Sequence, residues 1–184
     1  MFMSDVVPLL TKAITSRTTT RSESPFEAMV REHWDAVYRL LQSMTGSIHD
    51  TEDLAQETFL RAWKRIGTFQ PGTRMRSWLL KIAANAFLDE QRRRKRARVH
   101  VLDADVQGPV VAAGHAIDMR EQAALVREAM NDLSELTRLV FHLRATEDLS
   151  FREIAEVAGT TEQSARWHMH HARTWILQRM GGGK

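Results

Sequence analysis

Acidic and basic side chains are segregated in the first half of this chain, and each group could bind a partner of opposite charge. Acidic and amide side chains gather between residues 50 and 57, and no Lys or Arg occurs from Met44 to Leu60. Basic residues become frequent from Arg61 onward and culminate in the run 92–96. Carboxylates attract basic protein surfaces, whereas clustered guanidiniums suit nucleic-acid phosphates. The alternative is that the acids only occupy the first turns of a helix, whose N-terminal end favours negative charge.

Three histidines, His168, His170 and His171, are the first candidates for a metal site. On a helix their spacing does not bring the three rings to one point, as a separation of four residues would. Cys is absent, which excludes disulfides, thiol catalysis and cysteine-based zinc sites. The chain also has no nucleophile–base pattern, phosphate-binding loop or dinucleotide fingerprint. We therefore expect no catalytic residues, no metal and no cofactor, and predict that the chain is not an enzyme.

The charged segments are predicted to lie on helices of an all-α protein. Ser24, Pro25 and Glu27 supply an N-cap, an N1 proline and an N3 glutamate for a first helix. Ser47 and Asp50 form the start of a second helix. The apolar stripe of that second helix consists of Ala55, Phe59, Ala62, Trp63 and Ile66.

A third helix, from about residue 74 to 98, follows the loop 67–73 and carries most of the basic side chains. Trp63 and Trp78 lie on apolar stripes, so we expect both to pack in the core. Phe69 lies outside any stripe and is the better candidate to face solvent or an unstacked base. Positive charge beside an aromatic loop suits single-stranded nucleic acid.

The chain then divides into two parts. Residues 99–117 lose the basic residues and any lasting periodicity, which predicts a linker between two helical domains, 24–98 and 118–184. The alternative, a short strand at 99–102, would have no partner strand. Residues 1–23 are polar and weakly patterned and are predicted to be disordered.

The end of the chain has the pattern of a helix-turn-helix. A capping box at Ser150 and Glu153 opens a short helix, Gly159 turns the chain, and a longer helix follows from Glu162 to about Met180. In this motif the second helix enters the major groove, where Gln pairs with adenine and Arg with guanine. The alternative is a solvated polar helix face. The candidate DNA contacts are Thr161, Glu162, Gln163, Ser164, Arg166, Trp167 and Arg173.

In this order, the motifs resemble the sigma factors of bacterial RNA polymerase, within the extracytoplasmic-function (ECF) group of the sigma-70 family. Residues 50–63 look like the polymerase-binding helix of that family, and residues 76–94 look like the segment that opens and reads the −10 element. Residues 149–159 and the following helix look like the reader of the −35 element. Three motifs in the expected order are more specific than any one of them.

The resemblance implies a region 2 helical bundle and a region 4 helix-turn-helix, joined by a flexible linker. It also implies three partners: core RNA polymerase through its beta-prime and beta subunits, promoter DNA that the protein helps to melt, and an inhibitory anti-sigma factor. The implied polymerase contacts are Asp50, Glu52, Asp53, Leu54, Gln56 and Glu57. The implied −10 contacts are Phe69, Arg76, Lys81, Asn85, Arg92 and Arg93, with Asn85 and the loop 67–73 lining a pocket for a flipped base.

The recognition helix departs from the family pattern. Where arginines are usual, this sequence has His168 and His171, and a small residue is replaced by Trp167. Neutral imidazoles attract phosphates less than guanidiniums, so we expect −35 binding that is weaker and more dependent on pH. Whether Trp167 contacts DNA or packs against a neighbouring element is left open.

Two rival functions remain. A stand-alone helix-turn-helix regulator would bind duplex DNA without polymerase and would leave the acidic helix unexplained. A histidine-dependent metalloenzyme acting on nucleic acid would need a bound metal. No apolar run approaches the roughly 18 residues of a membrane span, and the N-terminus has no secretion signal, so we expect a cytoplasmic protein without membrane insertion.

Overall fold

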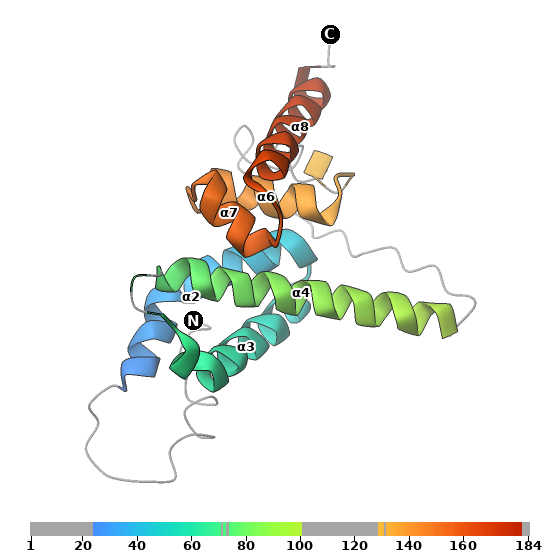
Figure 1. Cartoon of the computed structure of the whole chain (residues 1–184). Coiled ribbons are helices and arrows are strands. Elements are labelled where there is room, and N and C mark those ends of the chain that lie inside the picture. The colour runs from blue at the N-terminus through green and yellow to red at the C-terminus, as the bar shows by residue number, and fades with distance from the viewer. Residues whose placement is uncertain (1–23, 71, 73, 101–128, 131, 182–184) are drawn as a thin grey trace, which may run out of the picture.

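The computed structural model describes residues 24–70, 72, 74–100, 129–130 and 132–181. The expectations for residues 1–23 and 101–128 therefore lie outside the described residues. Figure 1 shows two groups of helices, α2 to α4 and α6 to α8, with the second group stacked on the first. The elements are α2 (Pro25–Thr45), α3 (Ile48–Arg65), the 3-10 turn η1 (Ile66–Thr68), α4 (Met75–His100), α6 (Glu135–Ala145), α7 (Phe151–Ala158) and α8 (Glu162–Gly181).

The helix starts follow from the capping residues that the sequence predicts. The hydroxyl of Ser24 accepts a hydrogen bond from the Glu27 backbone N–H at 3.1 Å, and the Glu27 carboxylate accepts one from the Ser24 N–H at 2.8 Å. Ser150 and Glu153 repeat this reciprocal arrangement at the start of α7. Gly159 ends α7 with a φ of +64°, a conformation that glycine adopts without a steric penalty. Both predicted capping boxes are confirmed.

The first core lies between α2, α3 and α4. Phe59 on α3 is fully buried and stacks on Trp34 of α2, with ring centroids 5.7 Å apart. Ala55 and Ala62 are buried on the same stripe, as predicted, and Trp78 packs against the core. Trp63 and Ile66, the other members of the predicted stripe, are exposed.

Trp63 was expected in the core, and that expectation is wrong. It lies on the last turn of α3, where its ring packs edge to face on Phe26 but remains 42% exposed. Ile66, three residues on, is exposed too. Periodicity identifies the side of a helix that faces the core, but it does not say where the neighbouring helices cease to cover that side.

The second group is built around α8. Ala165, Ala172 and Ile176 are buried and Met169 is partly buried, which confirms the predicted inward stripe. The small alanine side chains let α6 and α7 approach the backbone of α8 closely.

The two groups are in direct contact. Helix α6 packs on α2, α7 packs on α4, and buried residues of both groups form one continuous apolar cluster. Helix α4 runs to His100, two residues into the range 99–117 that was predicted to be linker. Val99 is therefore helical, which excludes a strand at that residue.

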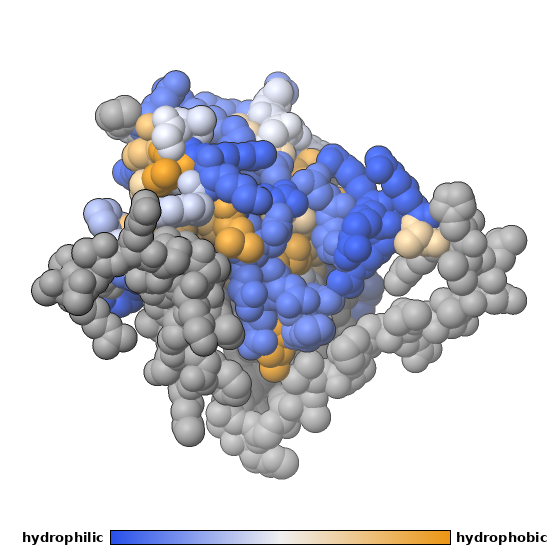
Figure 2. Space-filling model, turned by 90° about the horizontal axis from the view of Figure 1, so that it is seen from below, coloured by the Kyte–Doolittle hydropathy of each residue, from blue (hydrophilic) through white to orange (hydrophobic). Residues whose placement is uncertain are grey.

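No helix in the described part of the chain combines the length and apolar character needed to cross a bilayer. The face seen in Figure 2 is mainly hydrophilic, and its apolar side chains form small separate patches.

Candidate polymerase and nucleic-acid interfaces

The acidic residues of α3 are only partly available to a partner. Asp53 and Glu57 are exposed, whereas Glu52 and Gln56 are half-buried. Leu54 was predicted as a polymerase contact, but its side chain lies in the core and is 9% exposed. That prediction is corrected for this conformation, because a side chain inside the α2–α3–α4 core supports the helix and cannot be reached by a partner.

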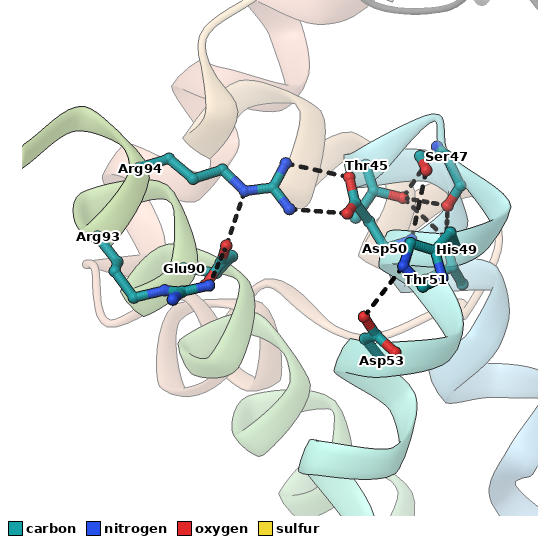
Figure 3. Close-up of polar contacts among 9 residues, drawn as sticks. All are labelled: Thr45, Ser47, His49, Asp50, Thr51, Asp53, Glu90, Arg93 and Arg94. Atoms are coloured by element: carbon teal, nitrogen blue, oxygen red, sulfur yellow. Dashed lines mark hydrogen bonds and ion pairs between the residues drawn. The ribbon is translucent and has the colours of Figure 1, made fainter. Parts of the chain in front are cut away.

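Asp50 is held by the basic helix α4. The guanidinium of Arg94 donates two hydrogen bonds to the Asp50 carboxylate, at 2.7 and 3.0 Å, and a third to Glu90 at 2.7 Å (Figure 3). The hydrogen bonds from Arg94 lower the pKa of Asp50, although partial burial opposes the shift. Glu90 is also paired with Arg93, and the hydrogen bonds from Arg93 and Arg94 lower its pKa to about 2.

These pairs revise the simple separation of charges seen in the sequence. Arg61 joins α3 to α4 by hydrogen bonds to Glu57 at 2.7 Å and to Asp89 at 2.9 Å. Part of the basic surface therefore neutralises the acidic helix from within the domain. Sequence reasoning missed Arg61 and Arg94, because the pairs that join α3 to α4 link residues 28 and 44 positions apart and leave no local pattern.

One face of α4 remains open to solvent. Lys81, Asn85 and Arg92 are exposed, and their separations of four and seven residues place them on one side of the helix. Arg93 is exposed as well, although its guanidinium is shared with Glu90. Phe69 is half-buried and packs edge to face on Trp78, with centroids 5.5 Å apart.

Arg76 differs from the other predicted −10 residues. Its guanidinium binds the carboxylate of Glu147, which belongs to the second group of helices. In this conformation Arg76 is therefore committed to a contact between the two groups, contrary to its predicted exposure to DNA. Nearby, Arg74 forms a longer ion pair with Glu153 of α7, at 3.5 Å.

The predicted −35 residues lie on α8 and on the turn before it, and they differ in exposure and in the contacts they make. Gln163 and Arg173 are exposed, and Ser164 is half-buried. The hydroxyl of Thr161 accepts a hydrogen bond from the Ser164 N–H at 3.1 Å, so Thr161 caps α8. Arg166 is exposed, bonds Glu162 at 3.0 Å, and lies over the ring of Phe151 at 4.9 Å.

Trp167 projects from α8 and is 59% exposed. Its ring is nearly parallel to that of His171, with centroids 5.2 Å apart, and no neighbouring helix covers it among the described residues. His168 instead turns inward, where its Nδ1 atom lies 2.9 Å from the hydroxyl of Thr137 on α6. Burial, and then the proximity of His171, lower the pKa of His168.

The position of His168 bears on two expectations. Because its ring contacts α6, His168 is less available to a phosphate than the exposed His171. Within the residues that the structure describes, no three potential metal ligands gather at one point.

Two successive segments of this chain match known protein-family regions. Sigma-70 region 2 matches residues 29–97, which contain most of α2 and all of α3, and Sigma-70, region 4 matches residues 123–176. Each match covers most of one of the two groups of helices described above.

Curated relatives give the same result. The ECF RNA polymerase sigma factor SigE of Mycolicibacterium smegmatis is 34% identical over 151 residues, or 80% of this chain. This chain spans only 58% of that protein. SigM of Bacillus subtilis is 30% identical over 74% of this chain and 83% of its own length.

Solved structures share the fold. The sigma factor RpoE from Bartonella quintana, in complex with the anti-sigma factor NepR, has a TM-score of 0.72 and 20% identity over 86% of this chain and 98% of its own. CnrH, in complex with the cytosolic domain of CnrY, has a TM-score of 0.65 and 22% identity over 97% of this chain and 98% of its own. Together with the two region matches and the identity to SigM, this fold shows that the chain belongs to the sigma-70 family, in the ECF group of RNA polymerase sigma factors.

Proposed function

We propose that this chain binds core RNA polymerase and directs it to promoters, where it recognises the −10 and −35 elements and assists DNA melting. The observation that carries the proposal is the exposed start of α8, where Gln163 and Arg166 face solvent directly after the turn at Gly159. Helix-turn-helix proteins read base edges with this part of the second helix. Membership of the sigma family favours this function over a stand-alone regulator.

Region 4, which we assign to residues 118–184, would bind the −35 duplex. Gln163 is suited to bidentate pairing with adenine and Arg166 with guanine. Arg173 would contact a phosphate, and Trp167 would meet the DNA surface because it is exposed beside these residues. Thr161 and Ser164 would contribute to DNA binding by fixing the start of α8, through the hydrogen bond between them. Glu162 can accept a hydrogen bond from a cytosine amino group or hold Arg166 in place.

Region 2, assigned to residues 24–98, would bind the −10 element in single-stranded form. Asn85 and the loop 67–73 would line a pocket for a flipped base, which offsets the few kcal/mol lost on unstacking. The exposed side chains of Lys81 and Arg92 would contact the adjacent phosphates. None of these roles requires bond chemistry, so we propose a non-enzymatic initiation factor that acts in the cytoplasm.

Core polymerase would dock on α3, through its beta-prime subunit. Asp53 and Glu57 are the exposed carboxylates of that face, and Asp53 is the more available to a basic partner because Arg61 already binds Glu57. Glu52 and Gln56 lie beside them, half-buried. Asp50 contributes less directly, because Arg94 already neutralises it.

The test is co-elution of the purified chain with bacterial core polymerase, comparing the wild type with Asp53→Lys. Asp53 is chosen because its only ion-pair partner in the described residues is exposed His49, at 3.7 Å, so reversing its charge leaves the α3–α4 contacts intact. Glu32→Lys on α2 applies the same charge reversal to another exposed residue and serves as the control. We expect binding by the wild type and the control and loss of binding by Asp53→Lys. An active wild-type protein that does not bind would favour the stand-alone regulator.

An anti-sigma factor is the remaining proposed partner. RpoE, which shares the fold, is described in complex with the anti-sigma factor NepR. We propose that a similar inhibitor covers the polymerase- and DNA-binding faces of this chain until a signal releases it. Its presence should prevent co-elution with core polymerase.

A further inference from the structure

One carboxylate lies buried between the two groups of helices. Glu147 follows the end of α6, and it is the only acidic residue classed as buried among those that the structure describes. Its Oε1 atom lies 3.2 Å from the guanidinium of Arg39 on α2, and its Oε2 atom binds Arg76 at the start of α4. The Nε2 atom of His142 lies 3.7 Å from Oε1, which is beyond hydrogen-bond distance.

This carboxylate is ionised. Burial alone would raise the pKa of Glu147, but the contacts from His142 and Arg76 and the charge of Arg39 outweigh burial and lower the pKa to about 2. A buried ion is tolerated only while its partners remain, since removing one partner leaves charge unpaired at low dielectric. Glu147 can therefore stay in this position only while region 2 supplies both arginines.

The two arginines depend on Glu147 in turn. Their side chains are each a little under half exposed, and within the described residues Glu147 is the only carboxylate in ion-pair contact with either. If region 4 moves away, two guanidiniums from different helices remain next to each other on region 2 without an anion. Paired guanidiniums match the geometry of a phosphate as well as that of a carboxylate.

The site has donor capacity that a carboxylate does not use. The Nε–H of Arg76 is buried without a hydrogen-bond partner. A backbone phosphate carries two charged oxygens, as a carboxylate does, and two weaker ester oxygens besides, so it could accept from both guanidiniums and from the free Nε–H. Arg76 also opens the helix that carries Lys81 and Asn85, the proposed contacts to single-stranded DNA.

We propose that Arg39 and Arg76 form one anion-binding site on region 2, which the Glu147 carboxylate fills in the compact chain and a backbone phosphate of single-stranded promoter DNA fills when region 4 moves away. This inference rests on the proposed binding of DNA by α4. It adds Arg39, which no sequence motif indicates, and it makes Glu147 an intramolecular competitor of DNA. Closure of the chain and occupancy of the site by DNA are therefore mutually exclusive.

The test compares Glu147→Gln and Arg39→Gln in the full chain. Binding of a short fluorescein-labelled oligothymidylate is measured by anisotropy as a function of salt, and the radius of gyration is measured by X-ray scattering. Both substitutions should expand the chain. Glu147→Gln should tighten DNA binding by about fivefold or more, within the usual range of coupling between sites. Arg39→Gln should weaken it and reduce the salt slope by about 0.7, the value for one phosphate contact.

The opposite signs separate a shared anion site from a purely structural ion pair. If both variants expand the chain and change DNA affinity in the same direction, the site is refuted. Glu156→Gln on α7 removes the same charge from an exposed position and should leave both affinity and radius close to the wild type. An equal gain in affinity from this control would assign the effect to net charge and overturn the proposal.

The wild-type chain provides a test without substitution. Saturating oligothymidylate should expand it, and binding without expansion would overturn the competition. If inorganic phosphate expands the chain but the oligonucleotide does not, the ligand is a free anion and the assignment to DNA is wrong. If no variant binds the oligonucleotide, the site is wrong, whereas co-elution with core polymerase still tests the proposed function separately.

Discussion

The arginines in the basic run of α4 differ in their contacts. Comparing Arg94 with Arg92 separates a contribution to the stability of the fold from a contribution to nucleic-acid binding. Arg94 is bound to Asp50 and Glu90 by three hydrogen bonds. Within the described residues Arg92 has only a long contact with Asp89, at 3.5 Å, and its side chain is 67% exposed. We predict that Arg94→Met lowers the stability of the fold, whereas Arg92→Met leaves stability unchanged and weakens contact with nucleic acid.

The expected loss can be worked out from the geometry. A bidentate arginine–carboxylate pair exceeds an ordinary surface pair, but Arg94 is 43% exposed, and solvent screening reduces its contribution to about 1 kcal/mol. For a chain of this length, that corresponds to a decrease of roughly 2–4 °C in Tm. Arg92→Met should instead reduce the salt slope of oligothymidylate binding by about 0.7, which Arg94→Met should not do.

The pH dependence supplies a second check on Arg94. Because the pKa of Asp50 is lowered in the folded chain, its pairing stabilises the fold above the unfolded-state pKa of about 4 and is lost as the pH falls below it. The difference in Tm between wild type and Arg94→Met should therefore be full at pH 7 and shrink below pH 4. Equal losses of Tm in Arg92→Met and Arg94→Met, measured by calorimetry, would refute the separation of roles.

Three further predictions concern the DNA-binding elements. Arg166→Ala should weaken −35 duplex binding about 5- to 150-fold, the equivalent of 1–3 kcal/mol, as measured by anisotropy. Asn85→Ala should slow open-complex formation, as measured by permanganate footprinting, and leave −35 duplex binding unchanged. His171→Arg should abolish most of the tightening of −35 binding between pH 7.5 and 6.0. His168→Arg should not, because burial lowers the pKa of His168. Equal pH responses in wild type and His171→Arg would exclude a role of His171 in this pH dependence. Gly159→Ala should lower stability by about 1 kcal/mol, since φ is +64°, and an unchanged denaturant midpoint would count against strain at the turn.

Local signals in the sequence were sufficient to predict the helices. Capping at Ser24 and Ser150 depends on residues three positions away, and the stripe of Ala165 and Ala172 depends on helical spacing. These features can be recognised without knowledge of the tertiary structure. The family resemblance adds the expected polymerase- and DNA-binding faces, and the individual contacts on those faces remain predictions.

The sequence does not indicate which side chains pair when they are far apart along the chain. Nothing near Glu147 indicates that its carboxylate lies against Arg39, which is 108 positions earlier. The commitment of Arg76 to an interdomain contact was hidden for the same reason, and so was the pairing of Arg94 with Asp50. Helical spacing likewise does not show that the ring of His168 lies against the hydroxyl of Thr137.

The contact between the two groups of helices is apolar as well as ionic. Leu143 and Leu149 of region 4 belong to the same buried cluster as Leu40 and Leu80 of region 2. Separating the regions exposes apolar surface to water and therefore carries a positive heat-capacity change. The closed fraction of the protein will thus vary with temperature along a curve with a maximum. Cooling below that maximum will expose Arg39 and Arg76, the proposed phosphate site, without any inducing ligand.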